Sequence, residues 1–551
     1  AGFRFGGPIV RDKLFFFMNG EILRQTSPQP FDQQYQGDSA GELDDLRQFL
    51  IDEVGFDPGT FGDKEASLDN EKFLGKIDWN INEDHRLSVR HQYSNSENVD
   101  ASRSGAFTIN FSSNNEVFPN ETNSTTLELN SSFGDNKSNK LILGFTDVLD
   151  DRGVNTEEPF PTIEISDGAG TIELGAEPFS TANLLDQKIF TLTNNFNWFL
   201  GDHTLTMGTH AEYYDIANLF IPFNFGWYFF FDVFGSGLES FKNAVRTGDL
   251  RGDTGILRGF PLVGPPNAVG DNAENVGAFN AFQVGVYLQD EWQASDRLKL
   301  TGGLRVDVPK VTTDPRFAPD VFETTVPAVM AKHDLNGARP GQTPDATFNL
   351  QPRLGFEYDA TADGSTVLRG GAGIFLGRQP FVWPGGMFLN NGANTGIVAR
   401  FFDGQFFGED DFFRPDPSNG VTNETFGAES PIPSGRLEIF EEGYRNPTVF
   451  RTSLGVDREL GAGFRGTLEG QYTKTIHNIS IKNVNLNPDC LRSIDGPDNR
   501  QVYGCAFSDG QPVASANQID TRYTNIHRVG NTSTGYTFDI SAQLQKRFDD
   551  R

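Results

Sequence analysis

A glycine-rich motif is the feature of this sequence that most resembles a site of chemistry. Residues 461–466 read GAGFRG and fit the G-x-G-x-x-G pattern of dinucleotide-binding proteins. That site requires the motif between a strand and a helix, so that the cofactor phosphates meet the start of the helix. Here the motif connects two segments that both alternate like strands, so we interpret it as a hairpin turn.

The ionisable side chains show no pattern typical of catalysis or metal binding. The 75 acidic residues are too many for any catalytic pair to be nominated, and no P-loop, zinc-protease or serine-hydrolase motif occurs. We predict no enzyme, no metal and no cofactor; calcium in a loop is an alternative, but its D-x-[DN]-x-[DN]-G pattern is missing. The histidines lack metal-ligand spacing, and a solvated or hydrogen-bonded role fits each better: His85, His91, His203, His210, His333, His477 and His527.

The two cysteines, Cys490 and Cys505, lie in one polar stretch of an otherwise cysteine-free chain. A zinc site would need more ligands than this stretch supplies. Two neighbouring cysteines in a loop favour one local disulfide and an oxidising compartment.

Composition and charge exclude other classes of protein. The chain has 51 Phe and 60 Gly among 551 residues, with few helix-forming stretches, which favours strands joined by turns. Its net charge of −30 makes nucleic acid an unlikely partner, because phosphates would be repelled. Much of the acid lies in expected loops, such as 38–53 and 409–411, where a solvated surface is the simplest interpretation.

Alternation of apolar and polar residues decides the fold class. In residues 86–93, Leu87, Val89 and Tyr93 fall on one face while Arg86 and Arg90 fall on the other, as in a strand with one apolar side. About fourteen segments behave in this way: 14–24, 71–81, 86–96, 122–133, 138–149, 187–199, 203–214, 280–293, 297–309, 351–360, 365–375, 449–459, 464–475 and 534–548. Most have the length of a tilted membrane strand, roughly 9–11 residues.

The connections between these segments alternate between short and long. The short ones are 82–85, 134–137, 200–202, 294–296, 361–364 and 460–463, and the long ones run roughly 25–70, 97–121, 150–186, 215–279, 310–350, 376–448 and 476–533. Short periplasmic turns and long extracellular loops are typical of an outer-membrane barrel. The sequence therefore predicts an all-β, transmembrane antiparallel β-barrel.

Aromatic residues mark one rim of this barrel. Trp79, Trp198 and Trp292 each precede a short turn on the apolar face, which favours a periplasmic aromatic girdle over ordinary core packing. Asp290 falls on the apolar face and needs a bulge or a rim position. The aromatic stretch 218–234 lies in a long loop; we expect it to extend a strand or to pack within the loop, and a ligand-contact patch is the alternative.

The polar face should line the lumen, where charged groups contact a plug or line a solute path, with plug contact favoured. The residues expected there are Lys76, Asp78, Arg86, Arg90, Lys299, Arg305, Asp307, Arg465 and Glu469.

Several stretches resemble the barrels of TonB-dependent outer-membrane receptors, specifically the Oar-like group. They include GGPIVRDKLFFFMNGEILRQ at 6–25, VGVYLQDEWQASDRLKLTGGLRVDVP at 284–309 and GYTFDISAQLQKRF at 535–548, and they cover strands rather than loops. The resemblance implies a barrel of about 22 strands with a plugged lumen. It also implies energy supplied from the inner membrane through TonB.

The chain departs from that family pattern, because no plug domain or TonB box is visible and about fourteen strands are too few for closure. We interpret residues 1–551 as a partial barrel domain that lacks the plug, the TonB box and C-terminal strands. Residues 1–6 are expected to end an earlier strand, and Gly7 to Lys13 to form the turn after it.

The resemblance implies import of an extracellular nutrient across the outer membrane of a Gram-negative bacterium. The expected partners are outer-membrane lipid, the protein's own plug, the TonB complex and an unknown ligand, but no nucleic acid. Two alternatives stay open. One is a barrel for surface interaction, adhesion or protein export that acts through its acidic loops. The other is a secreted soluble β-rich lectin or enzyme.

Overall fold

The computed structural model describes residues 1–548, except 234, 249, 251–253, 264–268, 271–276, 379, 402–412, 421–434, 494–496, 498, 509–510 and 513. The acidic residues 409–411 therefore lie outside the described residues, as does the last residue of the aromatic stretch 218–234.

One large sheet of eighteen strands dominates the fold. Three of its members, β8 (Gly153–Val154), β20 (Arg436–Phe440) and β27 (Asn525–Thr532), are short additions at the loop end. The long strands are β1 (Gly2–Val10), β2 (Leu14–Gln29), β3 (Lys64–Asn80), β4 (His85–Asp100), β6 (Glu116–Ser132), β7 (Lys137–Asp151), β11 (Asn183–Leu200), β12 (His203–Phe220), β15 (Ala278–Ser295), β16 (Leu298–Val311), β17 (Asn349–Asp359), β18 (Thr366–Leu376), β21 (Thr448–Gly461), β22 (Phe464–Asn483) and β28 (Tyr536–Lys546).

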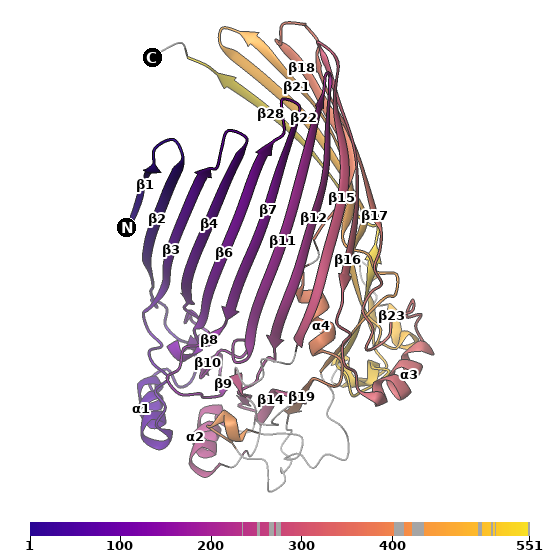
Figure 1. Cartoon of the computed structure of the whole chain (residues 1–551). Coiled ribbons are helices and arrows are strands. Elements are labelled where there is room, and N and C mark those ends of the chain that lie inside the picture. The colour runs from indigo at the N-terminus through magenta and orange to yellow at the C-terminus, as the bar shows by residue number, and fades with distance from the viewer. Residues whose placement is uncertain are drawn as a thin grey trace.

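The long strands form an antiparallel meander in which each strand pairs with the next one along the chain. Figure 1 shows the sheet curving, with its tight turns at one end and the long loops gathered at the other. Among the described residues, β1 pairs only with β2 and β28 only with β22, so no ladder closes the sheet on itself.

The structure confirms the predicted strand segments and the alternation of short turns with long loops. Most strands extend further on the loop side than the hydrophobic alternation indicates; β11, for example, begins at Asn183. The first residues belong to a strand, as expected, but the turn after it was predicted too long. β1 continues through Val10 against β2, and only residues 11–13 make the turn, with Asp12 at a φ of 61°.

The long loops fold into an extracellular cap around a second, six-stranded sheet. This sheet has the order β19-β14-β13-β9-β10-β5 and is built from four different loops. Its strands are β5 (Thr108–Asn110), β9 (Thr162–Asp167), β10 (Gly170–Leu174), β13 (Trp227–Phe230), β14 (Thr254–Pro261) and β19 (Thr395–Phe401). Loops that are far apart in sequence therefore hold one another by backbone hydrogen bonds.

The helices also lie in the loops. They are α1 (Leu43–Val54), α2 (Gly237–Thr247), α3 (Val326–Met330) and α4 (Val382–Leu389). Short helical turns occur as η1 (Ser112–Asn114), η3 (Val321–Thr325), η4 (Pro417–Asn419), η5 (Pro488–Cys490) and η6 (Ala514–Asn517), and two small ribbons as β23 (Leu491–Ser493) with β24 (Gln501–Tyr503) and β25 (Phe507–Ser508) with β26 (Gln511–Pro512). No helix among the described residues is long and apolar enough to cross a membrane.

The acidic stretch 38–53 is not an irregular loop. From Leu43 it forms α1, in which Leu43, Leu46 and Leu50 are buried while Asp44 and Asp45 lie in the first turn. Negative side chains at the start of a helix are attracted to the positive end of the helix dipole, and this stabilises the helix. Apolar residues at helical spacing in this short stretch could have indicated it.

The largest buried core of the molecule lies in the cap rather than in the barrel wall. It joins α1 and α2 to the six-stranded sheet through fully buried side chains such as Leu46, Ile163 and Phe230. The aromatic stretch 218–234 supplies part of it, because β12 extends to Phe220 and β13 then buries Tyr228 and Phe230. Both expected roles of that stretch, strand extension and loop packing, are present.

Removal of the Phe230 ring should unfold the cap and leave the barrel strands intact. Loss of a fully buried Phe side chain costs about 4 kcal/mol, and Phe230 is 0% exposed at the centre of the cap core. In Phe230→Ala we expect faster hydrogen exchange in β9 and β13 but unchanged exchange in β11 and β12. Phe107→Ala, at a position 63% exposed, is the control; equal exchange in both variants would contradict this core.

Stability of the cap should fall as the pH rises from about 4.5 to about 6. Burial and then the charge of Glu173 raise the pKa of Glu164 to about 6 from its ordinary value of 4.5, and the two carboxyls lie opposite each other on β9 and β10. The folded cap thus holds the proton more tightly than the unfolded chain, and the stabilisation is lost as the carboxyl ionises. Glu164→Gln should reduce this pH dependence in hydrogen exchange, whereas the exposed Glu158→Gln should not.

Candidate functional site: the lumen face and the extracellular mouth

Strand register divides the barrel sheet into a polar and an apolar face. Residues directly opposite on paired strands point to the same side of a sheet. One such row runs from Lys76 through Arg90, Thr126, Gly144, Thr191 and Glu212 to Gln283. All nine residues expected in the lumen share the face of this row, and most exposed large apolar side chains of the wall lie on the other face.

Asp78 is the centre of one group on this face. Its carboxylate accepts hydrogen bonds from Ser88 and pairs with Lys76 at 2.9 Å and with Arg86 at 3.3 Å. Further round the sheet, Lys299 forms a longer pair with Glu357, at 3.7 Å. Both groups link neighbouring strands across the wall.

Asp307 is the most deeply buried charge on the polar face, with 1% of its surface exposed. Arg305 donates two hydrogen bonds to it, from Nε at 2.6 Å and from Nη2 at 2.8 Å, and Gln351 donates a third. Gly285 makes room for this group, because a Cβ there would lie 2.3 Å from an Asp307 oxygen. A buried carboxylate fully satisfied in this way fixes the wall locally.

A fourth group joins β18, β21 and β22, and the sequence pattern singled out only part of it. Arg369 pairs with Asp457 at 3.0 Å and with Glu469 at 2.7 Å, and Arg465 approaches Asp457 at 3.8 Å. Of these, Arg465 and Glu469 were expected, but Arg369 and Asp457 were missed. Arg369 is followed by the glycine-rich run 370–373, where the apolar and polar alternation is weak.

Four arginines on the same face have no carboxylate within ion-pair distance in the described part of the chain: Arg4, Arg90, Arg353 and Arg451. Arg353 lies over the ring of Phe375 at 4.8 Å, and Arg451 donates to Thr473 at 3.2 Å. These arginines are therefore among the lumen charges that the wall itself does not neutralise.

The extracellular end of the lumen is narrowed by α4. Met387 and Phe388 of this helix pack on Tyr214 and Phe279, which lie on the polar face of β12 and β15. Arg378, which precedes α4, forms an ion pair with Glu212, and the hydroxyl of Tyr214 donates to the same carboxylate at 2.5 Å. The sequence pattern did not indicate this inward fold, because Glu212 and Arg378 lie in segments far apart.

A cavity of about 50 Å³ lies between α4 and the wall, bordered by Tyr214, Lys310, Arg378 and Tyr444 among others. The side chain of Tyr444 is 3% exposed, and its hydroxyl has no hydrogen-bond partner among the described residues. Burial raises the pKa of this hydroxyl, so it stays a neutral donor. The mouth therefore holds a buried donor on a side chain that borders a small cavity.

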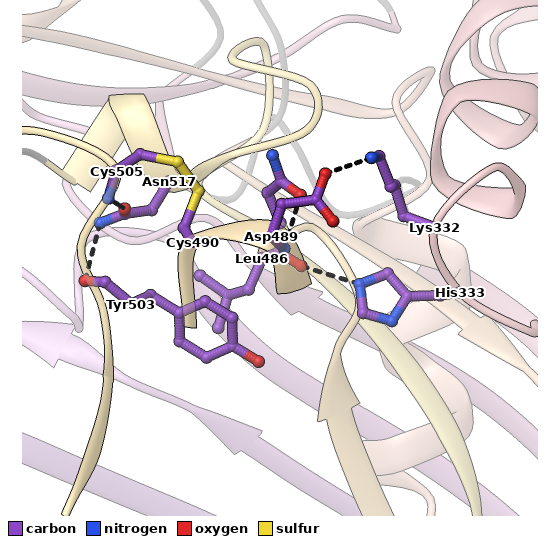
Figure 2. Close-up of a disulfide and its surroundings, with 9 residues drawn as sticks. Lys332, His333, Leu486, Asp489, Cys490, Tyr503, Cys505 and Asn517 are labelled. Carbon is purple, nitrogen blue, oxygen red and sulfur yellow. Dashed lines mark hydrogen bonds and ion pairs between the residues drawn. A yellow bond between two sulfur atoms is a disulfide. The ribbon is translucent and has the colours of Figure 1, made fainter. Parts of the chain in front are cut away.

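Two loops beside the mouth are tied together near the cysteines (Figure 2). The structure joins Cys490 and Cys505 in a disulfide, and the Cys505 backbone N–H donates to Asn517 at 2.8 Å. His333, after α3, donates from Nε2 to the carbonyl oxygen of Leu486 at 2.7 Å, and Lys332 pairs with Asp489. The loop after β16 is thus pinned to the loop after β22.

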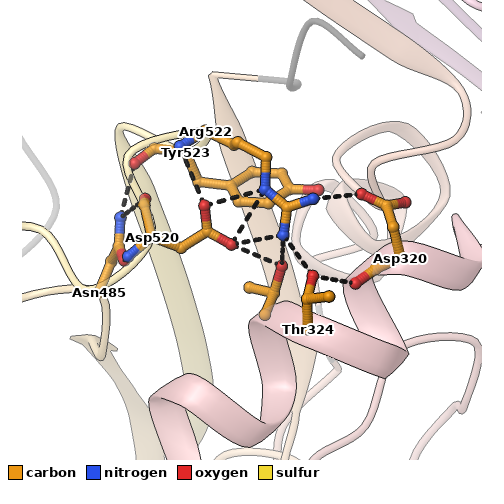
Figure 3. Close-up of polar contacts among 7 residues, drawn as sticks. Asp320, Thr324, Asn485, Asp520, Arg522 and Tyr523 are labelled. Atoms are coloured by element: carbon orange, nitrogen blue, oxygen red, sulfur yellow. Dashed lines mark hydrogen bonds and ion pairs between the residues drawn. The ribbon is translucent and has the colours of Figure 1, made fainter. Parts of the chain in front are cut away.

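Arg522 makes a second connection between the same loops (Figure 3). Its guanidinium donates to Asp520 at 2.7 Å and to Thr324 at 2.7 Å, and it pairs with Asp320. Burial alone would raise the pKa of Asp520, but hydrogen bonds from Arg522 and Thr325 hold the pKa below its usual value. No group of His, Cys, Asp and Glu within the described ranges is arranged to hold a metal ion.

The three tryptophans expected in a girdle lie on the apolar face at the turn end of the sheet. Trp79 and Trp292 are 40% and 41% exposed. Leu205 pairs with both Trp198 and Asp290, so Asp290 lies level with a girdle residue. Of the two explanations for Asp290, the rim position is therefore the one observed; the bulge of β15 comes later, between Gln293 and Ser295.

A comparison with known protein families shows to which family this chain belongs. The sequence matches the family described as outer membrane beta barrel domain over residues 54–551. The chain belongs to that family. The predicted fold and the location in the outer membrane of a Gram-negative bacterium are thereby confirmed, and the alternative of a secreted soluble protein is wrong.

A solved structure shows the same fold at low sequence identity. The outer membrane transporter YddB from Escherichia coli is 10% identical and aligns over 98% of this barrel and 50% of its own chain, with a TM-score of 0.53. The ferric enterobactin receptor PfeA from Pseudomonas aeruginosa is 12% identical and aligns over 98% of this barrel and 56% of its own chain, with a TM-score of 0.48. The siderophore receptor PirA from Acinetobacter baumannii is 11% identical and aligns over 100% of this barrel and 57% of its own chain, also with a TM-score of 0.48. This barrel spans about half the length of these structures. No curated protein matches it by sequence.

Asp307 should be essential for stability of the barrel wall. Asp307→Ala leaves Arg305 partly buried without its carboxylate, and breaking such a pair costs about 3–5 kcal/mol. We expect this loss in urea unfolding of the barrel from lipid vesicles. Arg451→Ala removes a cation without a carboxylate partner and should change stability by less than about 0.5 kcal/mol. Similar losses in both variants would show that the pairing is unimportant.

Proposed function

We propose that this chain is the barrel portion of a TonB-dependent receptor that binds a nutrient outside the cell and imports it. The observation that carries the proposal is the mouth: a buried, unpartnered Tyr444 hydroxyl beside a cavity, above a lumen with arginines that the wall leaves unpaired. Ligand sites characteristically combine an apolar lining with a few such polar groups. Structural similarity to the outer membrane transporter YddB supports the same class.

A plug domain supplied by a longer protein is the proposed partner of the unpaired arginines. A plug packed in the lumen would bring hydrogen-bond acceptors to Arg90, Arg353 and Arg451, whereas the cations already bound to wall carboxylates would contribute little. The plug would carry the TonB contact. In this proposal the protein is not an enzyme and needs no cofactor, because the barrel positions and admits a solute without chemical change.

A surface-interaction or export function is the second candidate, and the ordered cap is the observation that favours it. Four loops contribute strands to one sheet with a buried core, which presents a rigid outer surface. Rigid, loop-built surfaces suit recognition of another macromolecule as well as of a nutrient.

Binding to TonB separates the two functions. The periplasmic domain of the host's TonB, immobilised on beads, should retain the full-length protein from detergent-extracted outer membranes. The same protein truncated to residues 1–551 should not be retained. Absence of binding by a correctly folded, heat-modifiable full-length barrel would contradict the import proposal and favour surface interaction.

Glutamine at three of the unpaired arginines should loosen the plug. We expect Arg90→Gln, Arg353→Gln and Arg451→Gln together to make the plug sensitive to protease added from the periplasmic side, with an unchanged heat shift of the barrel. The matched control replaces the wall-paired cations Lys76, Arg369 and Arg465 by Gln. Equal protease sensitivity in both triple variants would argue against plug contact through the unpaired arginines.

A further inference from the structure

A second cavity, of about 560 Å³, borders the beginning of α4 at the extracellular end of the lumen. This volume lies within the range of roughly 300–1,000 Å³ that is typical of small-molecule sites. On the wall side its residues come from β6, β7, β11 and β12. Strand register places four of them in one row on the polar face: Asn120, Asp150, Leu185 and Asn218.

Two side-chain amides in this cavity, those of Gln187 and Asn218, have no hydrogen-bond partner among the described residues. Both side chains are only partly buried, and their amide atoms remain accessible to solvent. An amide carries N–H donors and a carbonyl acceptor, so each of the two can donate to a ligand and accept from it.

Asp150 adds a carboxylate to the same cavity. It accepts a hydrogen bond from Asn120, and no cation lies within ion-pair distance of it in the part of the chain that the structure describes. The arginine of the cavity, Arg152, is already held, because it lies over the ring of Phe118 at 4.3 Å and is 4.0 Å from Glu116. The charge that the cavity offers to a ligand is therefore the carboxylate of Asp150.

Towards the periplasm, the polar face of the same strands carries mainly hydroxyl groups. The ionic side chains there are paired, Glu128 with Lys140 at 3.0 Å and Glu212 with Arg378. The neutral polar residues include Thr122, Ser124, Thr126, Thr146, Thr191 and Thr193. A solute that moves along this described part of the wall meets hydrogen-bonding groups without a free cation.

We infer that this cavity binds a neutral oligosaccharide, an inference that deepens the import function proposed above and rests on it. A sugar hydroxyl both donates and accepts, so it matches the amides of Gln187 and Asn218. A cationic ligand would use the acceptors alone, and an anionic one would use the donors alone and be repelled by Asp150. A hydroxyl that donates to this carboxylate makes a stronger hydrogen bond than one that donates to a neutral acceptor.

The apolar lining completes the match with a sugar ring. Leu185, Phe381 and Val382 border the cavity, and Val382 is 65% exposed although it begins α4. The C–H groups of a sugar ring can cover such side chains while its hydroxyls reach the amides. A short peptide is less suited, because its carboxylate end needs a cation and the cations beside this part of the described wall are already paired.

Glycan binding by the full-length protein tests this inference. The protein, extracted in detergent, is applied to an array of short neutral glucans, galactans and mannans, with uronic-acid glycans, amino-sugar glycans and peptides beside them. We expect retention on neutral glycans, and the dissociation constant of the best-retained one is then measured by calorimetry. Gln187→Met and Asn218→Leu should each weaken its binding about tenfold, the effect of leaving a ligand hydroxyl without its partner.

Gln92→Met is the matched control. Gln92 lies on the polar face of β4 opposite Ser124, its amide also lacks a partner among the described residues, and it does not border the cavity. This variant should bind the glycan as the unmodified protein does, and all three variants should keep the heat shift of the barrel. Retention of no neutral glycan, retention of charged glycans or peptides alone, or equal affinity in Gln92→Met and Gln187→Met would overturn the site.

The TonB experiment above keeps this site separate from the import function. A protein that binds TonB but no neutral glycan keeps the import function and loses the site. A protein that binds a neutral glycan through Gln187 but does not bind TonB keeps the site and loses the import function.

Discussion

Pairing of every backbone polar group inside the hydrocarbon is the constraint on which this structure depends. Lipid offers no hydrogen bonds, so a chain that crosses it as strands must satisfy each N–H and C=O from its neighbours. The long ladders of β2 to β22 meet this requirement, with register shifts near strand ends, and they fix the register of the whole sheet. Once the register is fixed, so is the face to which each side chain points.

The two faces then meet different solvents and hold different chemistry. The lipid face needs little internal packing, so large apolar side chains stay on the surface. The polar face gathers charges that neutralise one another across strands, as Arg305 does with Asp307 and Arg369 with Asp457. The compact hydrophobic core, which most domains have between their layers, is found here in the extracellular cap. The mouth lies between cap and lumen, where α4 contacts the wall.

Exceptions to the alternation prove informative on both faces. Asp290 breaks the apolar pattern of β15, and the structure explains it by a partner, His203, and by its level at the girdle. Arg369, which connects three strands, was not singled out by the sequence pattern, because the alternation is weak in the glycine-rich run that follows it. Glu212 alternates along β12 as a residue of the polar face does, but its role depends on Arg378, which lies 166 residues away in sequence.

The sequence by itself determined the strands, the turns, the two faces and the outer-membrane class, because each depends on local spacing: period two along a strand and short or long connections between strands. Only the tertiary structure decided which loops share the cap sheet, that stretch 38–53 contains a helix, that α4 folds into the mouth, and which lumen charges are paired. These features depend on contacts between segments distant in the chain. No local pattern encodes them, since a loop residue acquires its partner only when the register of the barrel brings the loop ends together.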